Sequence, residues 1–127
     1  MSSVNDWVRK VHHLAVEAGW WLDHEIDRDL KPDARAAKHM LVVTEIAEAT
    51  EAVREQRPPI YQMMGEHVVD DHFLISVKPE GECIELADAV IRIMDYFGFM
   101  GWDLEKAIAM KHEYNKSRAF RHGGKAL

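Results

Sequence analysis

The chain has 127 residues, of which 22 are acidic and 16 are basic, so its net charge is −6, and 47% of its residues are hydrophobic. This length predicts one domain, residues 1–127, with a single core, and the acidic balance argues against non-specific nucleic-acid binding. One cysteine, Cys83, excludes an internal disulfide and is typical of a reducing compartment. No secretion signal opens the sequence, and no uncharged apolar run approaches the roughly 18 residues of a membrane span, so we expect a soluble cytoplasmic protein that does not contact membranes.

Two helices are expected in the first half of the chain. Apolar residues recur at helical spacing from about Val4 to Leu22. Ser3 is expected to cap this helix, and Asp6, three residues later, would complete a capping box. A second helix is expected from about Asp33 to Arg54, directly after Pro32.

Two further helices are expected in the second half. The third runs from about Gly81 to Phe97 and stops at Gly98. The fourth runs from Leu104 to about Phe120, with Asp103 as its N-cap and the pair Gly123-Gly124 after its end. Four helical segments predict an all-α fold.

A long insertion, residues 56–80, separates the second and third expected helices. Connections of this length in compact domains are usually functional or mobile. The insertion contains a β-leaning run, Phe73 to Val77. We interpret the insertion as a flap, with a short hairpin across Val68 to Val77 as one form it could take. The alternative is a surface excursion with no role.

Two short acidic segments carry most of the functional information. Glu45 and Glu48 lie three residues apart in the second expected helix, and Glu85 and Asp88 lie three residues apart in the third. Residues at this spacing are neighbours on a helix surface, so each helix presents a pair of carboxylates. Two such pairs brought together would form a cage of four oxygen donors, the ligand type that hard divalent cations such as Mg²⁺ prefer.

The third expected helix strengthens this interpretation because apolar residues fill most of its surface. Its charged residues share one face: Glu82, Glu85, Asp88, Arg92 and Asp95. A helix that is apolar over most of its circumference is buried on several sides. Its acidic stripe would then be half-buried and would need compensation by arginine, lysine or a cation. The alternative is that both acidic pairs are ordinary solvent-facing charges.

Positive charge gathers near the end of the chain, from Lys111 to Lys125. Lys111, Asn115, Arg118 and His122 fall within about 60° of one another on a helix, and Lys125 follows at once. The alternative, compensation of the helix dipole by terminal cations, does not explain an amide and a lysine held in line one or two turns earlier. Cation-binding carboxylates together with a basic, amide-bearing helix suggest a phosphorylated substrate.

These three motifs together resemble the MazG-like all-α nucleoside triphosphate pyrophosphohydrolases. The stretches concerned are TEIAEATEAVRE (44–55), ELADAVIRIMDY (85–96) and KHEYNKSRAFRHGGK (111–125), and the resemblance covers roughly Lys38 to Lys125. Two features depart from the family: Thr44 stands where many members have a glutamate, and the spacer between the acidic segments is longer. The resemblance implies a four-helix-core bundle that dimerises, here with the insertion between its second and third helices. It also implies Mg²⁺ as cofactor, with Mn²⁺ as a substitute, and cleavage of a nucleoside triphosphate to the monophosphate and pyrophosphate.

The resemblance also assigns roles to individual residues. The implied metal ligands are Glu45, Glu48, Glu85 and Asp88. We hypothesise that Glu48, with Glu45, orients or deprotonates the attacking water. The resemblance implies that Lys111, Asn115, Arg118 and Lys125 contact the substrate. From their own chemistry we add Lys38 and His122 as further substrate contacts and Trp20 as a stacking candidate for the base.

The choice of substrate is left open by the sequence. Trp20 and Trp21 point about 100° apart on a helix, so one of them could line a pocket or an interface; the alternative for both is core packing and dimer contact. The aromatic candidates favour a purine such as dGTP or GTP. A dUTPase-like enzyme of narrow specificity and a non-catalytic nucleotide-binding dimer are the alternatives. The apolar helices predict a homodimer or a dimer of dimers.

Overall fold

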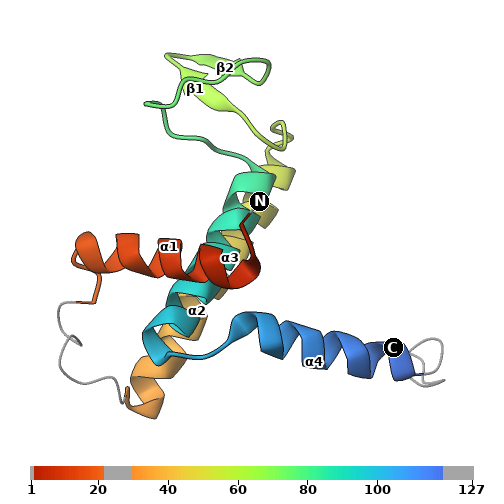
Figure 1. Cartoon of the computed structure of the whole chain (residues 1–127). Coiled ribbons are helices and arrows are strands. Elements are labelled where there is room, and N and C mark those ends of the chain that lie inside the picture. The colour runs from red at the N-terminus through yellow and green to blue at the C-terminus, as the bar shows by residue number, and fades with distance from the viewer. Residues whose placement is uncertain (1, 22–29, 119–127) are drawn as a thin grey trace.

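The computed structural model describes residues 2–21 and 30–118. This part of the chain is all-α apart from one short two-stranded sheet (Figure 1). The helices are α1 (Val4–Glu17), α2 (Pro32–Arg54), α3 (Glu82–Met100) and α4 (Leu104–Ser117), and the strands are β1 (Gln62–Met64) and β2 (His67–Val69). The second helix agrees with its predicted bounds to within one residue.

The first helix begins as predicted and ends earlier. The Ser3 hydroxyl accepts a hydrogen bond from the Asp6 backbone N–H, and the Asp6 carboxylate accepts one from the Ser3 backbone N–H, so the capping box is confirmed. The predicted end at Leu22 is wrong, because α1 stops at Glu17 and Gly19 takes a positive φ of 83°. A left-handed glycine shortly after the last turn is a common way to end a helix. Leu22 itself lies outside the described residues.

The third helix does not stop at Gly98, as predicted, but continues to Met100. It ends at Gly101, whose φ of 73° supplies the left-handed cap. Gly98 is needed for a different reason, since a Cβ atom there would lie only 2.5 Å from the Cβ of His12 on α1. The missing side chain lets α1 approach α3 closely.

The fourth helix begins at its predicted cap. The Asp103 carboxylate accepts hydrogen bonds from the Lys106 backbone N–H at 2.9 Å and from the Asn5 side-chain amide at 2.8 Å, and the second of these bonds ties the start of α4 to α1. The helix ends at Ser117. Its predicted end at Phe120 and the glycine pair beyond lie outside the described residues.

The insertion contains a hairpin, but not the predicted one. β1 pairs antiparallel with β2, Gln62 opposite Val69, across a two-residue loop that starts with Gly65 at a φ of 64°. The run from Phe73 to Val77 is not a strand. Its backbone bonds to a side chain instead: the Gln62 amide donates to the carbonyls of Leu74 and Val77 at 2.8 and 2.9 Å.

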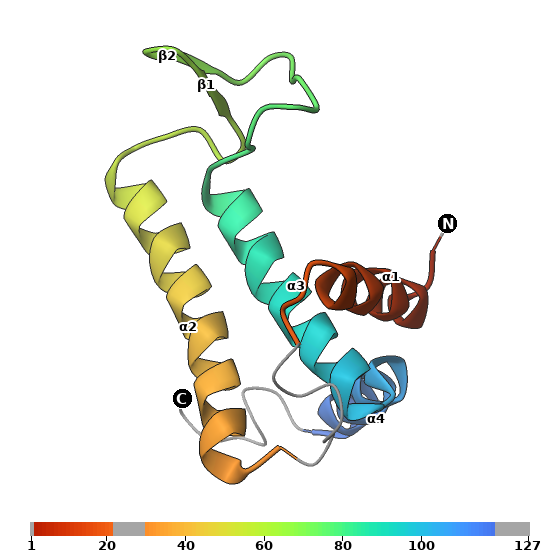
Figure 2. The same ribbon diagram turned by 90° about the vertical axis from the view of Figure 1, so that its left-hand side faces the viewer.

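The helices are arranged around α3. α2 and α3 lie side by side and antiparallel, while α1 packs against α3 and α4 packs against α1 (Figure 2). The insertion lies beyond one end of the α2–α3 pair, and α4 starts from the other end (Figure 1). A small core joins α1, α3 and the segment before α2; its buried residues are Ala15, Trp21, Leu30, Tyr96 and Phe99.

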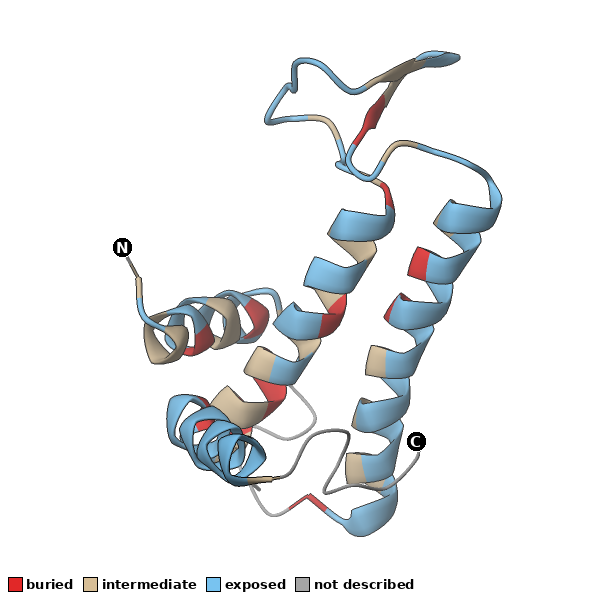
Figure 3. Ribbon diagram, turned by 90° about the vertical axis from the view of Figure 1, so that its right-hand side faces the viewer, coloured by how far each residue is buried: buried red, intermediate tan, exposed pale blue. Residues whose placement is uncertain are grey.

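Much of the apolar surface of the helices is exposed. Figure 3 shows that α2 and α4 are mainly exposed, apart from the side of α2 that faces α3. The large apolar side chains exposed on these helices and on α3 include Val43, Ile46, Leu86, Val90, Ile108, Met110 and Tyr114. None of the helices in the described segments is long and apolar enough to cross a membrane.

Candidate metal and nucleotide site

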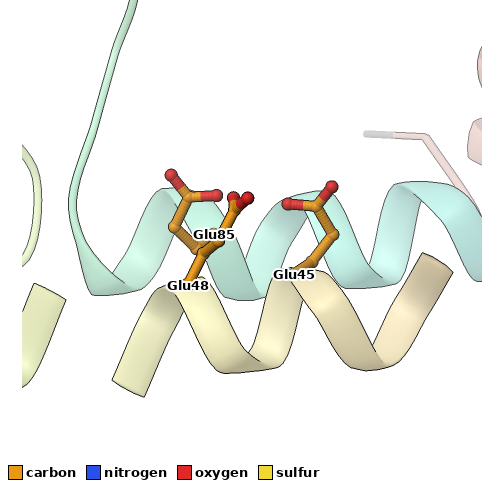
Figure 4. A group of neighbouring side chains, drawn as sticks. All are labelled: Glu45, Glu48 and Glu85. Carbon is orange, nitrogen blue, oxygen red and sulfur yellow. The ribbon is translucent and has the colours of Figure 1, made fainter. Parts of the chain in front are cut away.

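Three carboxylates from two helices meet between α2 and α3. Glu45 and Glu48 extend from α2 and Glu85 from the first turn of α3, all toward the same side of the helix pair (Figure 4). One oxygen of each lies within 4.8 Å of the other two. The spacing of three residues places Glu45 and Glu48 on neighbouring turns of one face, and the antiparallel packing brings Glu85 to them.

Asp88, the fourth predicted ligand, lies outside this group of three. It is partly buried one turn along α3 from Glu85. Its carboxyl is nevertheless within the electrostatic reach of the group, because the charge of Glu45 acts on it.

One arginine partly compensates the acidic cluster. The Arg92 Nε donates a hydrogen bond to Glu45 Oε1 at 2.8 Å. The Glu45 side chain is 10% exposed and Arg92 35% exposed, so this ion pair is partly shielded from water. A shielded, charge-assisted bond of this kind fixes the position of the Glu45 carboxylate.

Burial and the remaining negative charge together raise the pKa of two carboxyls. Burial, the hydrogen bond with Glu48 and the charges of Glu48 and Asp88 together raise the pKa of Glu85 to about 7. Burial and the charge of Glu45 raise the pKa of Asp88, against the opposing charges of Arg92 and Lys78. Carboxylates that are forced together without enough positive charge hold protons in this way.

Such a cluster suits a hard divalent cation. Oxygen atoms of glutamate and aspartate are the side-chain ligands that Mg²⁺ takes in proteins. A dication placed among Glu45, Glu48 and Glu85 would favour their charged forms and offset the repulsion that, together with burial, raises the pKa of Glu85.

A cavity adjoins the carboxylates. It has a volume of about 300 Å³ and lies between the segment after α1 and the pair α2–α3. Its lining residues are Trp20, Trp21, Lys38, Leu41, Arg92, Asp95 and Tyr96. Arg92 lines the cavity and also binds Glu45, so this one side chain links the cavity to the carboxylate cluster.

The two adjacent tryptophans have different environments. Trp21 is only 2% exposed; its ring stacks on Phe99 at a centroid distance of 3.9 Å, and the Lys38 ammonium lies 4.3 Å from its ring centre. Trp20 is 60% exposed at the cavity. Trp21 is therefore part of the core, and Trp20 is the one of the two with ring surface available to a ligand.

Asp95 is a buried carboxylate in the wall of the cavity. Its oxygens accept hydrogen bonds from the Trp21 indole N–H at 2.9 and 3.0 Å, and Oδ1 lies 2.8 Å from His12 Nδ1. Arg92 and Asp95 were not among the predicted site residues, although both share the acidic face of the third helix in the sequence. Because Arg92 and Asp95 share a helix face with Glu85, the sequence could have indicated that they lie at the site. The packing of Trp20 and Lys38 against this face of α3 could not be foreseen.

The predicted phosphate-binding residues of α4 lie elsewhere. The Lys111 ammonium lies 4.9 Å, and the Arg118 guanidinium carbon 5.7 Å, from the Tyr114 ring centre. Glu85 is in the first turn of α3, whereas α4 begins beyond its last turn, about 24 Å farther along the helix axis. Within one chain, α4 does not bring these cations to the carboxylates. His122 and Lys125 lie outside the described residues.

Comparison of the chain with protein-family models, with curated proteins and with solved structures finds no match. Function is therefore inferred from the side chains and their geometry.

Proposed function

We propose that the protein is a Mg²⁺-dependent nucleoside triphosphate pyrophosphohydrolase of the MazG-like kind. The observation that carries this proposal is the meeting of Glu45, Glu48 and Glu85, whose oxygens lie within 4.8 Å of one another, beside a cavity lined by aromatic and cationic side chains. A polyphosphate needs divalent cations to approach carboxylates, and a base needs an aromatic, partly apolar pocket. Both requirements are met at adjoining positions.

The residues that would hold the cation are Glu45, Glu48 and Glu85, with Asp88 close by. When bound, a divalent cation supplies charge neutralisation for the phosphates and lowers the pKa of a coordinated water. The raised pKa of Glu85 supports this assignment, since burial and the neighbouring carboxylates both disfavour its charged form until a cation is present.

Glu48 is the member of the cluster that we assign to the proton transfer. It is exposed, whereas Glu45 is buried and bonded to Arg92, so a Glu48 oxygen remains accessible to water. In the proposed reaction the water oxygen bonds to the α-phosphorus, the bond from that phosphorus to the bridging oxygen breaks, and Glu48 takes the proton. The products are the nucleoside monophosphate and pyrophosphate.

The cavity beside the cluster is the proposed position of the base. Trp20 offers an exposed ring for stacking, and Lys38 and Arg92 offer hydrogen-bond donors to a base or a phosphate. Donors of this kind suit the O6 and N7 acceptors of guanine, which supports a purine such as dGTP or GTP.

We also propose that the active protein is a homodimer. α2 packs chiefly against α3, and apolar side chains elsewhere on these helices are open to water. Exposed apolar patches of this extent mark association surfaces. A second copy would cover them, and its α4 could supply the cations that this chain's own α4 does not bring to the carboxylates.

Turnover is the first test. The full chain is incubated with Mg²⁺ and each ribo- and deoxynucleoside triphosphate in turn, and the products are separated by ion-exchange chromatography. We expect at least one nucleotide to give the monophosphate and pyrophosphate in equal amounts. Release of inorganic phosphate and the diphosphate would contradict the proposed bond cleavage, and nucleotide binding without any product would favour the non-catalytic dimer.

Trp20→Ala is expected to raise KM by about 5- to 150-fold, because base–aromatic stacking is worth about 1–3 kcal/mol per base, with a smaller effect on kcat. Trp7→Ala serves as the matched control, since Trp7, on α1, is also an exposed tryptophan but does not line the cavity. Steady-state kinetics on the best substrate measure both. Equal changes in the two variants would contradict the position assigned to the base.

A further inference from the structure

The insertion is a firmly built structure that ends in an apolar tip. Gln62, 3% exposed, fixes the loop: its side chain donates to the carbonyls of Leu74 and Val77 and accepts from the Leu74 N–H at 2.9 Å. Tyr61 and Glu80 close its base through two reciprocal backbone bonds of 2.9 and 2.8 Å. The loop holds its shape without covering its own apolar residues.

Three consecutive apolar side chains form this tip. Phe73 is 49%, Leu74 51% and Ile75 107% exposed, so Ile75 projects fully into solvent. A flexible loop could fold such residues inward. A loop held by Gln62 keeps them outward, which is the arrangement of a contact surface.

α4 offers a matching surface. Leu104 is its only buried residue in the described range, and a helix of 14 residues is marginally stable without packing. A shallow hollow of about 430 Å³ lies on one face. Its lining residues are Ala107, Ile108, Lys111, His112 and Asn115.

The two surfaces carry opposite charge. Glu66, Asp70 and Asp71 lie before the tip in the insertion. On α4 three lysines, Lys106, Lys111 and Lys116, outnumber the two glutamates, and Arg118 follows directly after the helix. Complementary charge of this kind steers association and fixes which surfaces meet.

The fold keeps the two surfaces apart within one chain. The insertion lies beyond one end of the α2–α3 pair and α4 starts from the other end (Figures 1 and 2). A two-fold axis perpendicular to this pair reverses a second copy relative to the first, so each insertion comes to the α4 end of the other copy.

We propose that the tip, Phe73 to Ile75, docks into the α4 hollow of a second copy of this chain. The contact is formed twice, once for each two-fold-related copy. A stable interface buries at least about 1,200 Å² in total, more than two such tips provide. The exposed apolar side chains of α2 and α3, among them Ile46 and Val90, supply the remaining area.

This contact would bring the partner's α4 to the end of the helix pair where Glu48 and Glu85 lie. The insertion joins α3 just before Glu85, and the Lys78 charge already acts on Asp88. The inference rests on the proposed homodimer and not on the proposed reaction.

Disulfide trapping tests the contact. In a Cys83→Ser background, an affinity-tagged Ile75→Cys chain is mixed with an untagged Ile108→Cys chain and oxidised mildly. We expect a covalent tagged–untagged dimer on a non-reducing gel. Glu113→Cys is the matched control, because position 113 is exposed on the opposite face of α4. Equal trapping at 113, or none at 108, would overturn the docking contact.

Sedimentation equilibrium separates this contact from dimerisation itself. We expect Ile75→Asp to weaken dimerisation about tenfold or more, and Ser76→Asp, which adds the same charge at the next exposed position, to change it less. A wild-type dimer that neither traps at 108 nor responds to Ile75→Asp would refute the docking contact and leave the homodimer standing. A wild-type monomer at micromolar concentration would refute both.

Discussion

Glu48→Gln is expected to lower kcat by about 10²–10⁴-fold, the range for loss of a general base, and at the same time to raise the stability of the protein without divalent cations. Activity falls because an amide cannot take the proton from water and is a poorer cation ligand. Stability rises because one of three crowded carboxylates becomes neutral, which removes a charge that, after burial, helps to raise the pKa of Glu85 to about 7. Opposite changes in activity and stability are typical of functional sites.

The matched control is Glu51→Gln. Glu51 lies one turn beyond Glu48 on α2 and forms an exposed ion pair with Arg54 at 3.7 Å, outside the cluster. Its substitution should leave kcat and stability nearly unchanged. The measurements are steady-state hydrolysis with Mg²⁺ and urea unfolding in EDTA. If Glu48→Gln kept full activity, or lost stability like a structural ion pair, the role assigned to Glu48 would be wrong.

Without divalent cations, the protein is expected to lose stability as the pH rises from about 4.5 to 7. The pKa of Glu85 is raised from 4.5 to about 7 in the folded state, mainly by burial and by the hydrogen bond with Glu48. Between these values the folded chain binds more protons than the unfolded chain, so the free energy of unfolding decreases as pH rises, and it levels off above the folded pKa. The raised pKa of Asp88 acts in the same direction from lower pH.

Urea unfolding in EDTA across this pH range measures the effect. Glu85→Gln should flatten the dependence, because it removes the titrating group. Asp6 and Asp103 make a useful contrast: capping hydrogen bonds lower the pKa of each, so they lose their stabilising contribution only at more acidic pH. Stability that increased from pH 5 to pH 7, or an unchanged slope in Glu85→Gln, would contradict the described crowding of the carboxylates.

Local sequence patterns predicted much of the fold. The capping box at Ser3, the cap at Asp103 and the extent of α2 follow from short-range chemistry that is visible in the sequence. The errors came from contacts between distant residues. Gly98 resembles a helix stop, but it lies inside α3, where a glycine is needed because His12 of α1 packs against it.

Contacts between distant residues also explain the error in the insertion. Phe73 to Val77 has strand-forming residues, yet their backbone partner is the side chain of Gln62, which no strand pattern reveals. The real hairpin surrounds Gly65, whose positive φ suits a tight turn. A glycine between two short apolar runs was the available sequence signal.

The candidate site likewise has a part that local spacing predicted and a part that it could not predict. Helical spacing placed Glu45 beside Glu48, and the packing of α2 on α3 added Glu85. Spacing could not place α4, because the orientation of that helix depends on the connection at Gly101 and on the contact between Asn5 and Asp103. Lys111 and Asn115 therefore remain predictions that depend on a second copy.

Isothermal titration of Mg²⁺ into the cation-free protein at neutral pH tests the metal site directly, without knowledge of the substrate. We predict binding that releases about half a proton per chain, since Glu85 with a pKa of about 7 is roughly half protonated there. Buffers of different ionisation enthalpy reveal the release. Glu85→Gln should bind more weakly and release no proton. Absence of binding at millimolar Mg²⁺, or identical binding and proton release by Glu85→Gln, would contradict a cation site built from Glu45, Glu48 and Glu85.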